Sequence, residues 1–504
     1  MQPQLAPSAS RPASPPAGLA SILDQIVSRR KLAVAAAERQ LSVRRMAREL
    51  RLNPEPRREF VAALRLSRRP AVIAELKRAS PSRGRLREDF DVPALAAAYE
   101  RAGAAALSVL TEPHWFEGKL EYLAQARQAT RLPILRKDFI FSNYQVWESA
   151  HAGADAILLI AAMLDDAQLE QLVLTARRAN LAVLCEVHTE QELRRASRFG
   201  ADCLGVNSRD LHSFEVDLGV AERLGPLIPG SRVGVAESGL RSAADLARMS
   251  AAGYTAFLVG ESFMRQPDPG AALEQLLGDC QVPFVKICGL TNLDDARHAC
   301  AVGANAVGFV FAPSPRRVSG EQVRAIAPML PAEVLRVGVF AEVPLAEVQA
   351  LAQACGLHAV QLHGNYDPAA ARRLSSAVPV WRALAMPAEA EAAAPWTPFV
   401  ERFVLDGGSG GSGQSFDWTA AQTFIRGLPA NAVGAGATLL AGGLNAANVA
   451  AALRACGACG ADVSSGVELR PGHKSPLAVS AFCRAARSAF WGASAQDAAQ
   501  GAAE

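Results

Sequence analysis

Charged and amide side chains follow five apolar runs in the first half of the chain, where core residues alone would be expected. These side chains are Glu75, Lys77, Lys137, Glu186, Asn207, Arg209 and Glu237. Residues two apart on a strand point to the same side, so Glu75 shares its facing with Lys77, as Asn207 does with Arg209. Three cations that converge with three carboxylates suit an anionic substrate and proton transfer.

The second half offers a different candidate, Cys288, in the stretch VKICGLTN over 285–292. A free cysteine is more often a plain core residue than a reactive one. A thiol with a pKa of about 8.5 is mostly protonated at neutral pH, so a base would need a shifted pKa. Lys286 lies two residues earlier and could lower that pKa, unless it pairs with a carboxylate deeper in the core.

Glycine and serine follow the last two apolar runs of each half. The residues concerned are Ser238, Gly239 and Gly260 in the first half and Gly442, Gly443, Ser464 and Ser465 in the second. Small residues let backbone N–H groups approach an anion closely. Because both halves carry the same pair of loops, the sequence predicts two phosphorylated substrates, or one substrate that is handled twice.

The elements that must position these residues alternate between apolar runs and segments with helical spacing. The first half has runs over 71–76, 105–110, 133–139, 156–161, 182–187, 203–207, 232–238 and 256–262. The second half has runs over 284–289, 306–311, 335–340, 359–364, 380–385, 402–407, 438–443 and 461–466. Near-continuous apolar strands indicate a parallel sheet that is covered on both faces, and eight strand–helix cycles indicate a (β/α)8 barrel. We therefore predict an α/β chain of two tandem (β/α)8 TIM barrels, in which the polar residues lie at the carboxyl ends of the strands.

Changes in composition along the chain set the predicted domain limits. We predict a disordered tail rich in Pro, Ser and Ala over 1–19, a first barrel with a helical extension over 20–279, a second barrel over 280–492 and a tail over 493–504. The Gly- and Ser-rich segment 407–416 follows a strand of the second barrel, so we expect a mobile loop at its mouth.

Composition also excludes several classes of function. A net charge of +3 argues against a nucleic-acid partner. No apolar run reaches the roughly 20 residues of a membrane helix. The nine cysteines lack disulfide-like spacing, which predicts a cytoplasmic protein. The pair Cys456 and Cys459 stands without a second pair or a His cluster, so we predict a turn there and no metal site.

Several stretches match known enzyme families. The first barrel resembles indole-3-glycerol-phosphate synthase in AELKRASPS (74–82), PILRKDF (133–139), CEVH (185–188), GVNSRDL (205–211) and AESG (236–239). The second resembles phosphoribosylanthranilate isomerase in VKICGLTN, VGFVFAPSPRRVS (307–319), AVQLHG (359–364), VLDGGSGGSGQSFDW (404–418), AGGLN (441–445) and DVSSGVE (462–468). The order of the two halves is similar to that of the bifunctional enzymes of bacterial tryptophan biosynthesis.

For the second barrel, the resemblance implies isomerisation of N-(5-phosphoribosyl)anthranilate to 1-(2-carboxyphenylamino)-1-deoxyribulose 5-phosphate. Asp406 would be the general acid, Cys288 the general base and Arg317 the residue that anchors the substrate. His363, at a strand end, is equally well explained as a structural residue or as a substrate contact.

For the first barrel, the resemblance implies closure of the indole ring to give indole-3-glycerol phosphate, with loss of CO2 and water. Lys137 would be the general acid, and Lys77 would hold the substrate carboxylate or the developing charge. Glu186 with Glu75 would manage the later proton transfers and the departing hydroxyl. The remaining residues would orient or bind the substrate: Asn207, Glu237, Ser80, Arg209, Ser238, Gly239 and Gly260.

The resemblance further implies a monomer that needs no metal or organic cofactor and binds small phosphorylated, carboxylate-bearing substrates, with no nucleic-acid or membrane partner. Two alternatives stay open at this point. Lys137 could instead be the nucleophile of a Schiff-base aldolase, after desolvation lowers its pKa. The barrels could also be a non-catalytic phosphate-metabolite binding protein, although that protein would need neither Lys137 nor Cys288.

Overall fold

The computed structural model of the protein describes residues 22–52, 56–210, 213–278, 281–407, 417–429 and 438–489. Three predicted segments therefore lie wholly or largely outside the described residues: the tail over 1–19, the glycine-rich loop over 407–416 and the tail over 493–504.

The first barrel is a closed ring of eight parallel strands, as the sequence predicts. Its strands are β1 (Ala71–Leu76), β4 (Ala106–Leu110), β5 (Ile134–Lys137), β6 (Ala156–Ile160), β7 (Ala182–Val187), β8 (Cys203–Asn207), β9 (Val233–Glu237) and β10 (Ala256–Val259). Its outer helices are α4 (Val92–Ala102), α5 (Glu121–Ala129), α6 (Asn143–His151), α7 (Asp166–Arg178), α8 (Glu190–Phe199), α9 (Leu218–Leu224), α10 (Ala243–Ala251), α11 (Glu261–Met264) and α12 (Pro269–Leu277).

The second barrel repeats this closed parallel ring. Its strands are β11 (Phe284–Ile287), β12 (Ala306–Val310), β13 (Leu335–Ala341), β14 (Ala359–His363), β15 (Val380–Ala385), β16 (Arg402–Asp406), β17 (Leu439–Leu440) and β18 (Gly460–Val463). Its helices are α13 (Leu293–Ala301), α14 (Gly320–Ile326), α15 (Leu345–Ala354), α16 (Pro368–Leu374), α17 (Trp418–Gly427), α18 (Val449–Cys456) and α19 (Pro476–Arg487). The prediction of two tandem barrels is confirmed, and Cys456 to Cys459 form the predicted turn between α18 and β18.

Two short hairpins extend from the strand ends. One, β2 (Ala79–Ser80) with β3 (Gly84–Arg85), follows the first strand of the first barrel. The other, β19 (Glu468–Arg470) with β20 (His473–Lys474), follows the last strand of the second barrel.

The strand period decides which side chains enter each barrel. Ile73 on β1 belongs to a cluster of buried strand residues inside the first barrel, whereas Val72 and Ala74 pack outward against the helices. Glu75 lies two residues beyond Ile73 and therefore points inward at the mouth. Lys137, Glu186 and Glu237 likewise lie two residues beyond interior residues of β5, β7 and β9, so they also point inward at the mouth.

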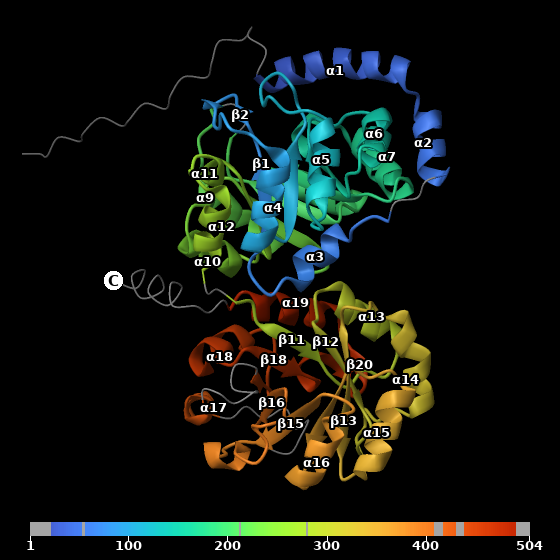
Figure 1. Ribbon diagram of the computed structural model, residues 1–504, viewed down its shortest axis with the longest axis vertical. Coiled ribbons are helices and arrows are strands. Elements are labelled where there is room, and N and C mark those ends of the chain that lie inside the picture. The colour runs from blue at the N-terminus through green and yellow to red at the C-terminus, as the bar shows by residue number, and fades with distance from the viewer. Residues whose placement is uncertain are drawn as a thin grey trace, which may run out of the picture.

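Three helices precede the first strand: α1 (Ile22–Gln40), α2 (Val43–Leu52) and α3 (Phe60–Leu66). Phe60 and Leu64 of α3 join the apolar cluster inside the barrel and close its amino-terminal end. Helix α1 lies across the opposite end, which carries the polar strand termini (Figure 1).

The two barrels are stacked, with α3 of the first and α19 of the second between them (Figure 1). Arg487 donates to the Ser67 carbonyl at 2.9 Å, and Arg484 donates to the Ile228 carbonyl at 2.9 Å. The mouth under α1 therefore lies at the end of the first barrel away from the second. Among the described residues, no helix has the length and apolarity that crossing a membrane requires.

Candidate active sites

Lys137 occupies the centre of the mouth of the first barrel. Its ammonium group lies 3.1 Å from Glu186 Oε2 and 3.2 Å from Glu237 Oε2. The three side chains come from β5, β7 and β9, and both carboxylates are almost fully buried. One cation thus faces two carboxylates in a site with little solvent.

The other predicted residues of this mouth surround that centre. Lys77 pairs with Glu75 at 2.6 Å. Asn207 Nδ2 donates to Glu186 Oε1 at 3.0 Å, and the Arg209 backbone N–H donates to Asn207 Oδ1 at 3.0 Å. The Asn207 amide therefore links Glu186 to the strand end that carries Arg209.

The close charges separate the protonation states of the two carboxylates. Burial opposes the charge of Lys137, but Glu186 and Glu237 outweigh it and raise the pKa of Lys137 above its usual range. Burial likewise disfavours ionised Glu186, yet Lys137, His188 and Asn207 together lower its pKa. Glu237 also shares Lys137, but burial together with the charge of Glu186 raises its pKa to about 7. Two carboxylates in one site with divergent pKa values are suited to different proton-transfer roles.

A cavity of about 1800 Å³ opens above this cluster. Several predicted binding residues line it: Ser80, Arg209, Ser238, Gly239 and Gly260. Phe116 and Phe139 also line it, with ring centroids 6.0 Å apart, as does Ile26 of α1. Sequence reasoning missed these apolar walls, because a loop aromatic or a helical isoleucine looks like an ordinary core residue.

Gly205 on β8 keeps room for the Glu237 carboxylate. A Cβ at position 205 would overlap Glu237 Oε1. We expect Gly205→Ala to displace that carboxylate and to lower the reaction rate at this mouth by about 10- to 100-fold, since a small misplacement of a reacting group can cost that much. Steady-state rates of both reactions on one preparation would test this. The reaction of the second barrel serves as the internal control, and an unchanged rate at this mouth would show that the position of Glu237 is not required.

The mouth of the second barrel is organised around a buried ion pair. Lys286 Nζ lies 2.6 Å from Asp462 Oδ2, between neighbouring strands β11 and β18. Cys288 follows β11, and Asp406 ends β16. The Lys286–Asp462 pair shifts the pKa of both Cys288 and Asp406, so the two groups lie within electrostatic reach of one centre.

The sequence left two possibilities for Lys286: it could lower the pKa of Cys288, or it could pair with a carboxylate deeper in the core. Burial raises the pKa of the Cys288 thiol, and Lys286 only partly offsets this effect. Lys286 is paired with Asp462, whose charge also disfavours the thiolate, but burial is the largest cause of the raised pKa. Burial and Asp462 also raise the pKa of Asp406, to about 6.

The arginine beside Cys288 is Arg316 rather than Arg317. Arg317 is exposed, whereas Arg316 and Ser464 pack against Gly289, the residue that follows Cys288. Arg316 is held by Glu468 through two contacts of 2.8 Å. Adjacent arginines on a loop share no strand period, so spacing alone could not choose between them.

The remaining predicted residues lie at strand ends of the same mouth. His363 ends β14, where Gln361 Nε2 is 2.7 Å from His363 Nε2. Burial lowers the pKa of His363 to about 4, so its ring is neutral near pH 7. Gly442 has a φ of +82°, and a Cβ there would stand 3.0 Å from Asp406 Oδ1. Gly443, Ser464 and Ser465 follow β17 and β18.

Metal ligation was not predicted for either mouth. Across the ranges that the structure describes, no group of three or more His, Cys, Asp or Glu side chains has a metal-binding arrangement.

Comparisons with known proteins give a consistent picture of both halves. The family model described as indole-3-glycerol phosphate synthase matches residues 23–276, and that of N-(5'-phosphoribosyl)anthranilate isomerase matches residues 285–485. The tryptophan biosynthesis protein TrpCF of Salmonella typhi is 37% identical over 462 residues, covering 90% of this chain and 96% of that protein.

Two further relatives match one half each. The indole-3-glycerol phosphate synthase of Albidiferax ferrireducens is 48% identical over 263 residues, covering 51% of this chain and 98% of the relative. The solved structure of phosphoribosyl anthranilate isomerase from Thermus thermophilus is 37% identical, covers 40% of this chain and 97% of its own, and has a TM-score of 0.36. Because both family models match in tandem and a fused relative is aligned over nearly its whole length, the chain belongs to the bifunctional tryptophan-biosynthesis enzymes that join an indole-3-glycerol phosphate synthase to a phosphoribosylanthranilate isomerase.

Proposed function

We propose specific catalytic roles for the residues at the two mouths. The observation that carries the proposal is the placement of Lys137 between Glu186 and Glu237 in one barrel, and of Cys288 and Asp406 around one ion pair in the other. The second barrel acts first, and its aminoketose product is the substrate of the first barrel.

In the isomerase, Asp406 protonates the ribose ring oxygen as the C1–O bond breaks, and a cationic imine forms at C1. The Cys288 thiolate then takes the proton from C2, which gives an enolamine that rearranges to the aminoketose. A carboxyl group with a pKa of about 6 is a much better proton donor near neutrality than an ordinary aspartate. Arg316, rather than Arg317, anchors the substrate beside the thiol.

The isomerase should have an unusual pH profile. We expect kcat/KM to rise up to about pH 6, the pKa of Asp406, and then to stay level through neutrality. Above that pH the protonated fraction of Asp406 falls while the Cys288 thiolate fraction still rises, since its pKa is raised, and the two changes cancel. In Asp406→Asn, the residual kcat/KM should instead keep rising, roughly tenfold per pH unit. A variant profile that levels off at the same pH would contradict the assignment of Asp406 as the acid.

In the synthase, protonated Lys137 donates to the carbonyl oxygen of the aminoketose while the aromatic ring attacks that carbon. Loss of CO2 restores electrons to the ring. The hydroxyl then takes up a proton and leaves as water while the neighbouring CH2 carbon loses a proton, which completes the indole. Glu186, which is ionised, takes up a proton in these later steps together with Glu75. Glu237 and Asn207 orient the reacting groups, and Lys77 holds the substrate carboxylate.

The protonation of Lys137 also bears on the alternative that the first barrel is a Schiff-base aldolase. A Schiff-base lysine must be neutral to attack a carbonyl, so its pKa has to be low. Two carboxylates hold the pKa of Lys137 above its ordinary value, which favours a proton donor over a nucleophile. Borohydride with the synthase substrate should therefore leave Lys137 unmodified, and a trapped adduct on Lys137 would contradict the proposal.

The direct test of the proposed function is an assay of the intact chain with N-(5-phosphoribosyl)anthranilate alone. We expect both the aminoketose and indole-3-glycerol phosphate to appear in that order, without added metal or organic cofactor. Accumulation of the aminoketose with no indole product would show that the first barrel is not a synthase.

Broader properties complete the proposal. The synthase unit spans 20–279 and the isomerase unit 280–492, in a monomer that acts in the cytoplasm on small phosphorylated carboxylates, without nucleic-acid or membrane partners. Eight cysteines within the described ranges are free thiols, which supports a reducing compartment.

A further inference from the structure

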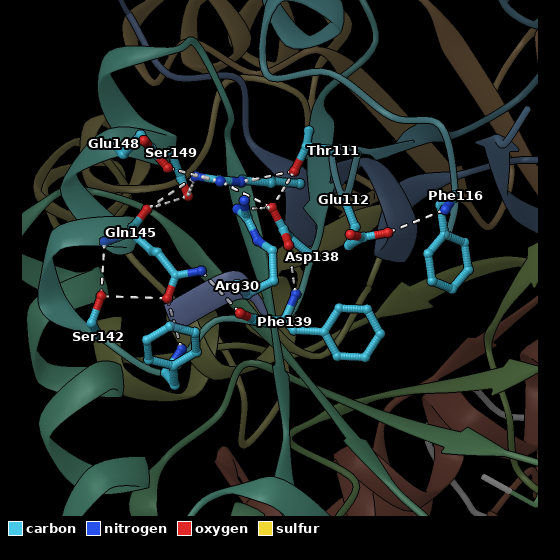
Figure 2. Close-up of polar contacts among 12 residues, drawn as sticks. Arg30, Thr111, Glu112, Phe116, Asp138, Phe139, Ser142, Gln145, Glu148 and Ser149 are labelled. Atoms are coloured by element: carbon cyan, nitrogen blue, oxygen red, sulfur yellow. Dashed lines mark hydrogen bonds and ion pairs between the residues drawn. The ribbon is translucent and has the colours of Figure 1, made fainter. Parts of the chain in front are cut away.

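A buried ionic cluster joins helix α1 to the strand end that carries Lys137. Asp138, the residue after Lys137, is its centre, and Arg30 and Thr111 both point at it (Figure 2). Asp138 Oδ2 lies 2.7 Å from Arg30 Nη2 and accepts from Thr111 Oγ1 at 2.6 Å. Its other oxygen, Oδ1, accepts the backbone N–H of Phe139 at 2.8 Å. Asp138 is 1% exposed, so these contacts are shielded from water.

Arg136 gives the cluster its second cation. It lies 3.0 Å from Asp138 Oδ2 and 2.8 Å from Glu148 Oε2, and it also donates to Ser149 Oγ at 3.1 Å. Arg30 and Arg136 thus balance the charges of Asp138 and Glu148. Without Arg30, two carboxylates would share one cation in a buried site, which is unfavourable.

Arg30 stands in the buried stripe of α1, where an apolar residue would satisfy packing alone. The stripe is formed by Ile26, Arg30 and Val34 at helical spacing. Ile26 lines the synthase cavity, and Val34 packs in a small apolar cluster with Met46 of α2 and Tyr144 of α6. A charge between two apolar contacts defines where α1 lies along the barrel, because its directional contact with Asp138 allows little sliding.

The chain then transmits this contact to the reacting groups. Asp138 is bonded directly to Lys137 on one side and to Phe139 on the other, and both side chains line the synthase cavity. Ile22, Leu23 and Ile26 of α1 form part of the same cavity wall. One ion pair therefore positions both the helix above the substrate and the strand end below it.

We propose that Arg30 is a positioning residue of the synthase reaction, which acts through Asp138 to seat α1 over the cavity and to hold Lys137 and Phe139 in their reactive arrangement. The proposal rests on the role of Lys137 proposed above. Arg30 does not take part in proton transfer.

The test compares three variants of the full chain with the parent. Arg30→Met removes the charge but keeps much of the length, and Arg30→Lys keeps the charge with a different donor geometry. Arg29→Met, at an exposed position on the same helix, is the matched control. kcat and KM of the synthase are measured on each variant, together with isomerase activity and thermal unfolding.

We expect Arg30→Met to lower synthase kcat by about 10- to 100-fold and to raise KM, since a small displacement of reacting groups has that effect. Arg30→Lys should recover part of the loss, while Arg29→Met should stay close to the parent. Isomerase activity should be unaffected in all three. A change in kcat is the informative result, because a helix that only walls the cavity would alter KM alone.

Two results would overturn the proposal. One is a folded Arg30→Met enzyme whose kcat matches the parent, and the other is a parallel loss of both activities that follows unfolding. If Arg30→Met does not fold, Arg30→Lys is the test: a synthase kcat below that of the parent supports the proposal, and a kcat equal to that of the parent overturns it. Lys137→Ala is assayed alongside: full synthase activity in that variant would overturn the role of Lys137 itself, whatever Arg30 does.

Discussion

Lys137→Ala should abolish indole-ring formation while isomerisation continues at the parent rate. The lost proton donor alone is worth about 10²- to 10⁴-fold in rate, or about 3–5 kcal/mol of barrier. A second effect acts in the same direction. Glu186 and Glu237 lie 3.1 and 3.2 Å from the Lys137 ammonium, so its removal leaves these two buried carboxylates without the cation that they share. The pKa of at least one of them must rise, and the remaining proton-transfer chemistry at pH 7 is disturbed as well.

The measurement is a pair of single-reaction assays on the same purified variant, one started with each substrate. Lys137→Met is the matched control, because it preserves much of the packing but can neither donate a proton nor carry charge; it should fail equally. A variant that loses both activities while remaining folded would contradict two independent sites. A variant that keeps the synthase reaction would exclude Lys137 as its acid.

Cys288→Ala should have the opposite effect: no isomerisation, with full conversion of added aminoketose to indole-3-glycerol phosphate. The thiol is the group proposed to remove the C2 proton, and the small cavity left by alanine is confined to one mouth. We expect a loss of at least about 10²-fold, as for other general bases.

Cys288→Ser separates the chemistry of the thiol from its packing. A hydroxyl group occupies nearly the same place, but it is far harder to deprotonate than a thiol, so the serine variant should be about as inactive as the alanine variant. Isomerase activity in Cys288→Ser near that of the parent would show that the side chain is structural. Thermal unfolding of both variants checks that the barrel is intact.

Much of each site followed from the sequence because strands have a simple period. Ile73 belongs inside the barrel, so Glu75 must point inward at the end of the same strand. The parallel arrangement then brings all strand ends to one rim, which is why residues as far apart as Lys137 and Glu237 could be expected in one place. Periodicity and the resemblance between motifs each lead to the same mouth.

Other features depend on partners that no local pattern reveals. Lys286 pairs with Asp462 across 176 positions of sequence; burial raises the pKa of the Cys288 thiol, and the two charges of this pair modify it in opposite directions. The choice between Arg316 and Arg317 depends on a loop without a period and on Glu468, far along the chain. The sequence predicted an arginine on this loop, and the structure shows that Arg316 is the one that lies beside Cys288.

The sequence by itself determined two parallel barrels, the order of their activities along the chain and the set of strand ends that carry charged side chains, since these depend on local periodicity and motif identity. Only the tertiary structure decided the direction in which the pKa of Glu186, Glu237, Cys288 and Asp406 is shifted, and the contact of Arg30 with Asp138. These features depend on burial and on charges that folding brings within a few ångströms of each other. A linear sequence specifies neither the burial of a side chain nor its distance from a charge far along the chain.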